Sequence, residues 1–174
     1  MIAVSKGSPN VERIAQYIFD DGFPSKTVSL CTADSLPPLS DLIQPSSARF
    51  VLLLALDATK LDTSLVYAAA EKLLAKGMVY VCVWGPDGER VEDIFDKAII
   101  ERNPNETGKS VVITTCHNKE PLSEAVWFFL NCAWPADDYV DTCSDWVAAV
   151  IGNPAWEAEV RAKLLAEKEE SESP

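Results

Sequence analysis

Two apolar runs decide the fold: residues 50–57 read F-V-L-L-L-A-L-D, and residues 78–85 read M-V-Y-V-C-V-W-G. Each run is continuous and of strand length, which is typical of a strand covered on both faces of a sheet. Between them, the apolar residues of 59–77 recur at helical spacing, and Gly77 is a typical helix stop. This stretch predicts a strand, a helix and a second strand parallel to the first.

The same alternation continues toward the C-terminus. After a turn at residues 86–88, residues 89–102 carry an amphipathic helical pattern and residues 110–115 are predicted to form the third strong strand. Short connections between alternating strands and helices indicate right-handed crossovers in a parallel sheet. We therefore predict an α/β fold with three strong parallel strands in a Rossmann-like layered sheet flanked by helices. Residues 27–31, in a proline-rich segment, could add a fourth strand at the edge.

Both ends of the chain carry helical patterns. Residues 11–21 place apolar side chains at helical spacing and Gly22 follows as a stop, so they predict an N-terminal helix. The C-terminal third is predicted to be wholly helical. Its three helices are separated by proline-containing breaks and cover residues 120–133, 136–151 and 155–170.

The length of 174 residues fits one domain with a core of ordinary size. We expect a single α/β domain over residues 1–170. Its sheet core lies at about 27–117 and its helical part at 120–170 in this prediction. The polar residues 171–174 are expected to form a frayed acidic tail.

The charge excludes some classes of function. Acidic residues outnumber basic ones by 27 to 15, a net charge of −12, which disfavours binding to nucleic-acid phosphates. No apolar run has the length of a membrane span, and the N-terminus lacks the pattern of a secretory signal. We expect a soluble cytoplasmic protein that binds neither nucleic acid nor membrane.

The cysteines do not suggest a disulfide framework or a metal site. Five of them occur singly, without a C-x-x-C pair, which favours reduced thiols. With a single histidine in the chain, a zinc site is not expected. We predict no metal and no cofactor.

Polar residues follow the predicted strands at the edge where open α/β sheets place their ligands. Candidate catalytic residues are Asp57, Thr115, His117 and Glu120. His117 would act as a general base oriented by Asp57 or Glu120, because an imidazole titrates near neutral pH and needs an acceptor behind it. The alternative is a loop histidine that is hydrogen-bonded to a neighbouring carboxylate and has no catalytic role.

The turn W-G-P-D-G-E-R at residues 84–90 is the closest approach to a phosphate loop, but it lacks the spacing of one. Its backbone N–H groups and Arg90 could meet an anion, or the segment could be an ordinary strand-to-helix turn. Candidate ligand-binding residues are Gly85, Asp87, Arg90 and Thr114.

The interval between Lys119 and Arg161 contains eight acidic residues, no basic residue and four of the five tryptophans. Such a segment suits docking on a basic protein or self-association as a homodimer. The alternative is that the acids solvate helices whose tryptophans are core. Candidate surface residues are Trp134, Asp137, Asp138, Tyr139, Asp141 and Trp156. We favour a non-enzymatic interaction or regulatory module, with a small enzyme or ligand binder as the alternative.

One block resembles a known pattern. Residues 114–128 read T-T-C-H-N-K-E-P-L-S-E-A-V-W-F, similar to T-T-W-H-x-x-E-P-L-x-E-x-x-W-F in a family of small uncharacterised bacterial proteins. Cys116 replaces the tryptophan of that pattern, so a stacking role for the ring does not carry over. The resemblance implies a bacterial, cytoplasmic α/β protein and no mechanism.

Overall fold

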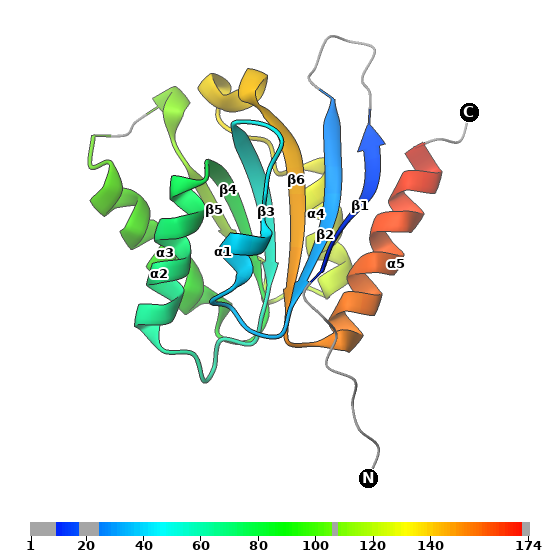
Figure 1. Cartoon of the computed structure of the whole chain (residues 1–174), viewed down its shortest axis with the longest axis horizontal. Coiled ribbons are helices and arrows are strands. Elements are labelled where there is room, and N and C mark those ends of the chain that lie inside the picture. Colours follow the sequence, from blue (N-terminus) through cyan, green and yellow to red (C-terminus); the bar gives the residue numbers. More distant parts are fainter. Residues whose placement is uncertain (1–9, 18–24, 106–107, 172–174) are drawn as a thin grey trace.

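A computed structural model describes residues 10–17, 25–105 and 108–171 of the chain. A six-stranded sheet lies between two layers of helices (Figure 1). The strands are β1 (Asn10–Tyr17), β2 (Lys26–Ala33), β3 (Arg49–Ala55), β4 (Met78–Trp84), β5 (Ile113–Cys116) and β6 (Cys143–Ile151). The helices are α1 (Leu39–Leu42), α2 (Thr63–Ala75), α3 (Gly88–Arg102), α4 (Leu122–Asn131) and α5 (Pro154–Ser171), with 3-10 turns η1 (Gly108–Ser110) and η2 (Asp137–Thr142).

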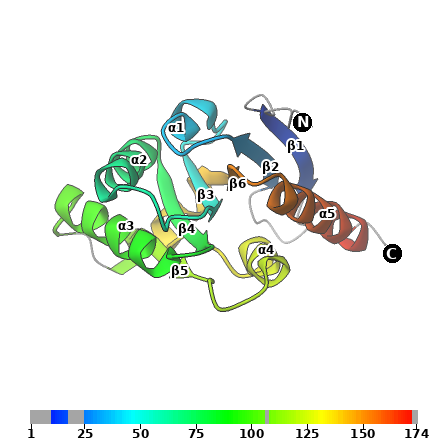
Figure 2. The ribbon, with the colours of Figure 1, turned by 90° about the horizontal axis from the view of Figure 1, so that it is seen from below.

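The strand order is β1-β2-β6-β3-β4-β5, and every neighbouring pair is parallel except β1 with β2. The path from β3 through β4 to β5 runs in one direction across the sheet, whereas the return from β5 to β6 runs in the other. Crossovers of one hand that run in opposite directions lie on opposite faces. Accordingly, α1, α2 and α3 cover one face and α4 and α5 cover the other (Figure 2).

Two apolar cores lie on either side of the sheet, and β3 supplies both. Leu52 and Leu54 face the core beneath α2 and α3, while Val51 and Leu53 face the core beneath α4 and α5. All four side chains are fully buried, and each contributes about 1.5–3 kcal/mol to folding by leaving water. This explains why the strand is apolar at every position rather than at alternate ones.

Two expectations from the sequence are confirmed: the α/β class and the strands near residues 27–31, 50–57, 78–85 and 110–115. The first of these, β2, is not an edge strand, because it pairs with both β1 and β6. The strand order also differs from the common doubly wound orders, so the Rossmann-like layout is not confirmed.

The predicted N-terminal helix is wrong where it is described, because Asn10–Tyr17 form strand β1; residues 18–22 lie outside the described part, as do 172–174 of the predicted tail. The register of β1 against β2 shifts between Arg13 and Ala15. This irregularity buries Ile14 and Ala15 together, which breaks the alternation that would indicate a strand.

The predicted helix at 136–151 is also wrong: the segment forms η2 and then strand β6. The C-terminal third is therefore not wholly helical, and the sheet extends over residues 10–151 instead of about 27–117. β6 lies between β2 and β3 and is buried on both faces, so its apolar residues show no period of two. A run of that kind cannot be distinguished from a buried helix by its pattern.

Candidate functional site

The carboxyl ends of β3, β4 and β5 bring most of the predicted site residues to one edge of the sheet. After β4 the chain enters α3 on one face, and after β5 it enters α4 on the other face. A place where neighbouring connections diverge in this way is where open α/β sheets commonly bind ligands. The polar side chains at this edge form two separate clusters.

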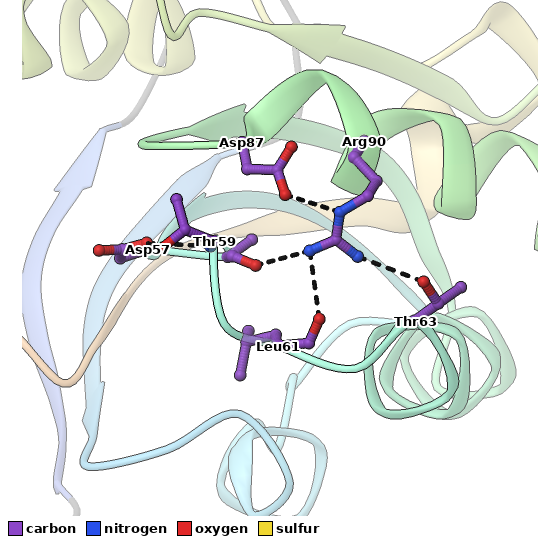
Figure 3. A network of polar contacts seen from close by, with 7 residues as sticks. Asp57, Thr59, Leu61, Thr63, Asp87 and Arg90 are labelled. Carbon is purple, nitrogen blue, oxygen red and sulfur yellow. Dashed lines mark hydrogen bonds and ion pairs between the residues drawn. The ribbon is translucent and has the colours of Figure 1, made fainter.

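The first cluster is centred on Arg90 (Figure 3). Its Nε donates to Asp87 Oδ2 at 2.6 Å. Its Nη2 donates to the carbonyl oxygens of Ala58 and Leu61 at 2.6 and 3.2 Å, and Nη1 donates to Thr63 Oγ1 at 3.3 Å. Four of the five guanidinium donors are thus occupied within the chain. Arg90 cross-links the first turn of α3 to the loop between β3 and α2.

The turn before Arg90 is constrained by its backbone conformation and by close contacts with neighbouring strands. Gly85 has φ +125°, and a Cβ placed on it would lie 2.1 Å from Leu56 O. Asp87 lies in the left-handed region at φ +63°, which aspartate tolerates better than most residues. A Cβ on Gly88 would lie 3.1 Å from Cys116 Sγ. Close packing against the neighbouring strands therefore accounts for the glycines of this turn.

Asp57 does not meet His117. Its Oδ1 accepts hydrogen bonds from the backbone N and the Oγ1 of Thr59 at 3.0 and 2.6 Å, and these bonds lower the pKa of Asp57. Strand β4 lies between β3 and β5, so the strands that end just before Asp57 and His117 are about 10 Å apart. Asp57 is exposed and closes its own loop.

The second cluster gathers around His117, whose side chain is buried. The Nε2 atom lies 3.1 Å from Thr115 Oγ1, and Nδ1 lies 3.4 Å from Glu120 Oε2. The imidazole packs on the ring of Phe128 with 4.3 Å between centroids. The structure therefore brings together three of the four candidate catalytic residues. A carboxylate, an imidazole and a hydroxyl in series can pass a proton, but here a phenyl ring covers the imidazole.

Thr114 points to the opposite face from Thr115, because successive side chains of a strand alternate. Its Oγ1 donates to Asp96 Oδ1 on α3 at 2.6 Å. Thr114 therefore fastens α3 to β5 and does not reach His117.

In the acidic segment, the predicted aromatic residues pack while the acids are exposed. Trp134 meets the buried Trp146 edge-on at 5.5 Å, and Trp156 meets Trp84 edge-on at 5.0 Å. The Tyr139 hydroxyl donates to Ser110 O at 2.6 Å. The three aspartates of η2 are exposed to solvent: Asp137, Asp138 and Asp141.

Sequence reasoning missed Trp127, which is 44% exposed and is the large aromatic on the outer face of α4. The spacing of the apolar residues in α4 contains a signal for this exposure. Leu122, Val126 and Phe129 are buried at helical spacing, which turns Trp127 and Glu124 outward.

Sequence reasoning also missed Lys26, a buried lysine at the start of β2. Its Nζ lies 4.5 Å from the ring centroids of both Trp134 and Trp146 and donates to Leu130 O at 2.5 Å. Burial lowers the pKa of Lys26 to about 8. No local pattern announces this arrangement, because its partners lie more than a hundred residues away in sequence.

Within the described ranges, no three His, Cys, Asp or Glu side chains gather as metal ligands. The cysteines described there are free thiols, three of them buried. No helix in the same part of the chain has the length and apolar character needed to cross a membrane.

The comparison with known proteins gives a family but no activity. No curated protein matches the chain. Residues 25–167 match a domain of unknown function, DUF7684, and this range includes the strands β2 to β6 and both polar clusters. Since the match covers most of the 174 residues, the chain belongs to the family defined by the domain of unknown function DUF7684.

Proposed function

We propose that the chain is a non-enzymatic interaction module that docks a basic protein segment on the outer face of α4. The observation that carries this proposal is the 44% exposure of Trp127. Glu124 lies one helical turn before it and Glu120 precedes the helix, and both carboxylates are exposed. We call Glu120, Glu124 and Trp127 the α4 docking face.

Charge complementarity selects the partner. A net charge of −12 draws cationic partners and repels a second copy of the chain, so a basic segment suits this face better than a homodimer does. An exposed indole also accepts Lys or Arg over its ring, an interaction worth about 0.5–1 kcal/mol at exposed sites. Lys119, the nearest base in sequence, is already paired with Glu89 at 3.0 Å. Since the thiols are unpaired, we propose that the module works in the reducing cytoplasm.

The test uses labelled synthetic peptides rich in Lys and Arg, with binding followed by fluorescence anisotropy at low and at physiological salt. We expect Trp127→Ala to weaken binding about tenfold, as for an aromatic anchor. Glu124→Gln should reduce both the affinity and its dependence on salt.

Two control variants lie on the other face of the sheet. Ile100→Ala removes an exposed apolar side chain from α3, and Asp93→Asn removes an exposed carboxylate from the same helix. Each should leave peptide binding unchanged. If the controls weaken binding as much as Trp127→Ala and Glu124→Gln do, the attraction is general and the docking face is refuted.

A second candidate, a small-molecule site at the carboxyl edge, is favoured by the contacts of Thr115, His117 and Glu120. It requires the imidazole to be uncovered. Because His117 is the only histidine, its modification by diethyl pyrocarbonate can be followed by mass spectrometry. Reaction as fast as that of free imidazole would support this site, and strong protection would exclude it.

A further inference from the structure

A cavity of about 380 Å³ opens at the amino ends of β3 and β4, on the opposite edge of the sheet from the predicted site. Its walls come from the last turns of α2 and α3 and from η2. The partly exposed Ile99 and Val112 provide apolar surface, and Tyr139 provides an aromatic ring. This volume lies in the range of small-ligand pockets, about 300–1,000 Å³.

The charge of this cavity is opposite to that of the chain. Arg49 and Arg102 line it, and no Asp or Glu among the described residues does, although acids outnumber bases by 27 to 15 in the sequence. Arg102 has no hydrogen-bond or ion-pair partner among the described residues. Arg49 donates to Ala48 O at 3.1 Å, and its guanidinium lies 5.4 Å from the centre of the Tyr139 ring, without a carboxylate partner in the described part. In the part of the chain that the structure describes, two cationic groups therefore face the cavity without a carboxylate beside them.

The negative C-terminal ends of α2 and α3 offset only part of this positive charge. A helix C-terminus carries about −0.5 of an elementary charge, so two helix ends offset about one of the two arginines. Some of the last carbonyls are also occupied within the chain: Leu74 O accepts from Gly77 N at 3.0 Å and Ile99 O from Asn103 N at 3.0 Å. The nearby Lys109 and Asp137 form an exposed pair at 3.7 Å and largely cancel. About one positive charge remains for a ligand.

We propose that this cavity binds a small organic anion. Arg49 and Arg102 hold the carboxylate or phosphate group of this anion, and its apolar or ring-shaped body lies against Ile99, Val112 and Tyr139. Guanidinium groups suit both anions because they donate two parallel hydrogen bonds to a pair of oxygens. The site is independent of the α4 docking face.

Phenyl phosphate and benzoate are the probes, since they carry the same ring and separate phosphate from carboxylate recognition. Titrations followed by amide NMR shifts should show saturable binding of at least one probe, with sodium chloride at equal ionic strength as the blank. Arg102→Gln should weaken it about tenfold, because it removes a charge-assisted contact. Lys97→Gln makes the same charge change on α3 outside the cavity and should weaken it less than about twofold.

Trp127→Ala should leave probe binding unchanged, which separates this site from the proposed function. Arg102 is exposed, so its replacement should not prevent folding, and circular dichroism verifies this. The proposal is overturned if neither probe shifts the resonances of cavity residues more than sodium chloride does. It is equally overturned if Arg102→Gln and Lys97→Gln weaken binding to the same extent.

Discussion

The two edges of the sheet differ in what their polar side chains do. At the carboxyl edge, Arg90 donates four hydrogen bonds to groups of the chain itself, and the Asp57 carboxylate accepts hydrogen bonds from Thr59 in its own loop. At the amino edge, Arg49 and Arg102 face a cavity without a carboxylate partner in the described part. A side chain with the right chemistry for binding a ligand is therefore not free to do so when groups of the chain already occupy it. What marks a candidate binding site is a charge that the fold leaves without a partner.

The largest effect should come from Gly85→Ala at the carboxyl edge. The new Cβ would lie 2.1 Å from Leu56 O, at a φ of +125° that side chains rarely adopt. We expect a loss of about 4 kcal/mol in the free energy of unfolding, from backbone strain and overpacking together.

Gly108→Ala is the matched control, because its φ is also positive, +69°, while nothing lies within 4 Å of the added Cβ. Its cost should be about 1 kcal/mol. Urea unfolding of both variants measures the difference, and equal losses would contradict a close approach at Gly85.

At the amino edge, Lys26→Met should change how stability depends on pH. The pKa of Lys26 is lowered from 10.5 to about 8 by burial. Below pH 8 both folded and unfolded states hold the proton, so the buried charge is a constant cost. Between pH 8 and 10.5 the folded state releases the proton while the unfolded state keeps it. The Lys26 contribution to stability therefore rises with pH, by up to about 3 kcal/mol.

The buried thiols change the pH dependence of stability in the opposite direction to Lys26. Burial raises the pKa of Cys82 and Cys143 to about 12, so unfolded thiols ionise first and stability falls above about pH 9. The difference between wild type and Lys26→Met cancels this common effect. Urea unfolding under reducing conditions at several values between pH 7 and 10 measures the free energy of unfolding of both proteins. As the pH rises, the wild type should gain stability relative to Lys26→Met. A constant difference would mean that Lys26 keeps its ordinary pKa.

Arg90→Gln tests how firmly the carboxyl edge is bound. It removes the guanidinium donor from the carbonyl oxygens of Ala58 and Leu61. Ala58 is fully buried, and its oxygen keeps only the hydrogen bond from Leu61 N at 3.0 Å. We expect a loss of about 2 kcal/mol in the free energy of unfolding, the range for charge-assisted hydrogen bonds. Urea denaturation provides the measurement, and a loss below 0.5 kcal/mol, roughly the usual size of a surface change, would show that the network is dispensable.

The smallest effect should come from Arg102→Gln at the amino edge. Arg102 is exposed and has no partner among the described residues, so its removal should change the free energy of unfolding by less than about 0.5 kcal/mol. The same denaturation experiment measures it beside Arg90→Gln. A loss comparable to that of Arg90→Gln would mean that Arg102 serves the fold and not a ligand.

Local patterns revealed the parts of the fold that have local causes. β3 and β4 are long apolar runs with a helix between them, and they were predicted within a few residues. β6 was missed because burial on both faces removes its alternation, and β1 because a register shift buries two successive residues. The failures thus concern strands whose pattern depends on their neighbours in the sheet.

The candidate sites follow the same rule. Thr115, His117 and Glu120 are close in sequence, and their meeting could be predicted. Asp57 does not join them, because the strand order that separates it from His117 has no local sequence signal. The amino-edge cavity combines Arg49, Arg102 and Tyr139 from three distant segments, so no window of sequence contains it.

The position of β6 also sets an order of events during synthesis. β2 and β3 are both made early, yet each pairs with β6, which emerges much later. Until then the two strands expose edges of unpaired N–H and C=O groups, the template on which chains aggregate. Such long-range pairing is also slow, because loop closure must precede it. The most aggregation-prone intermediate of this chain on the ribosome is therefore the one in which β6 has not yet emerged.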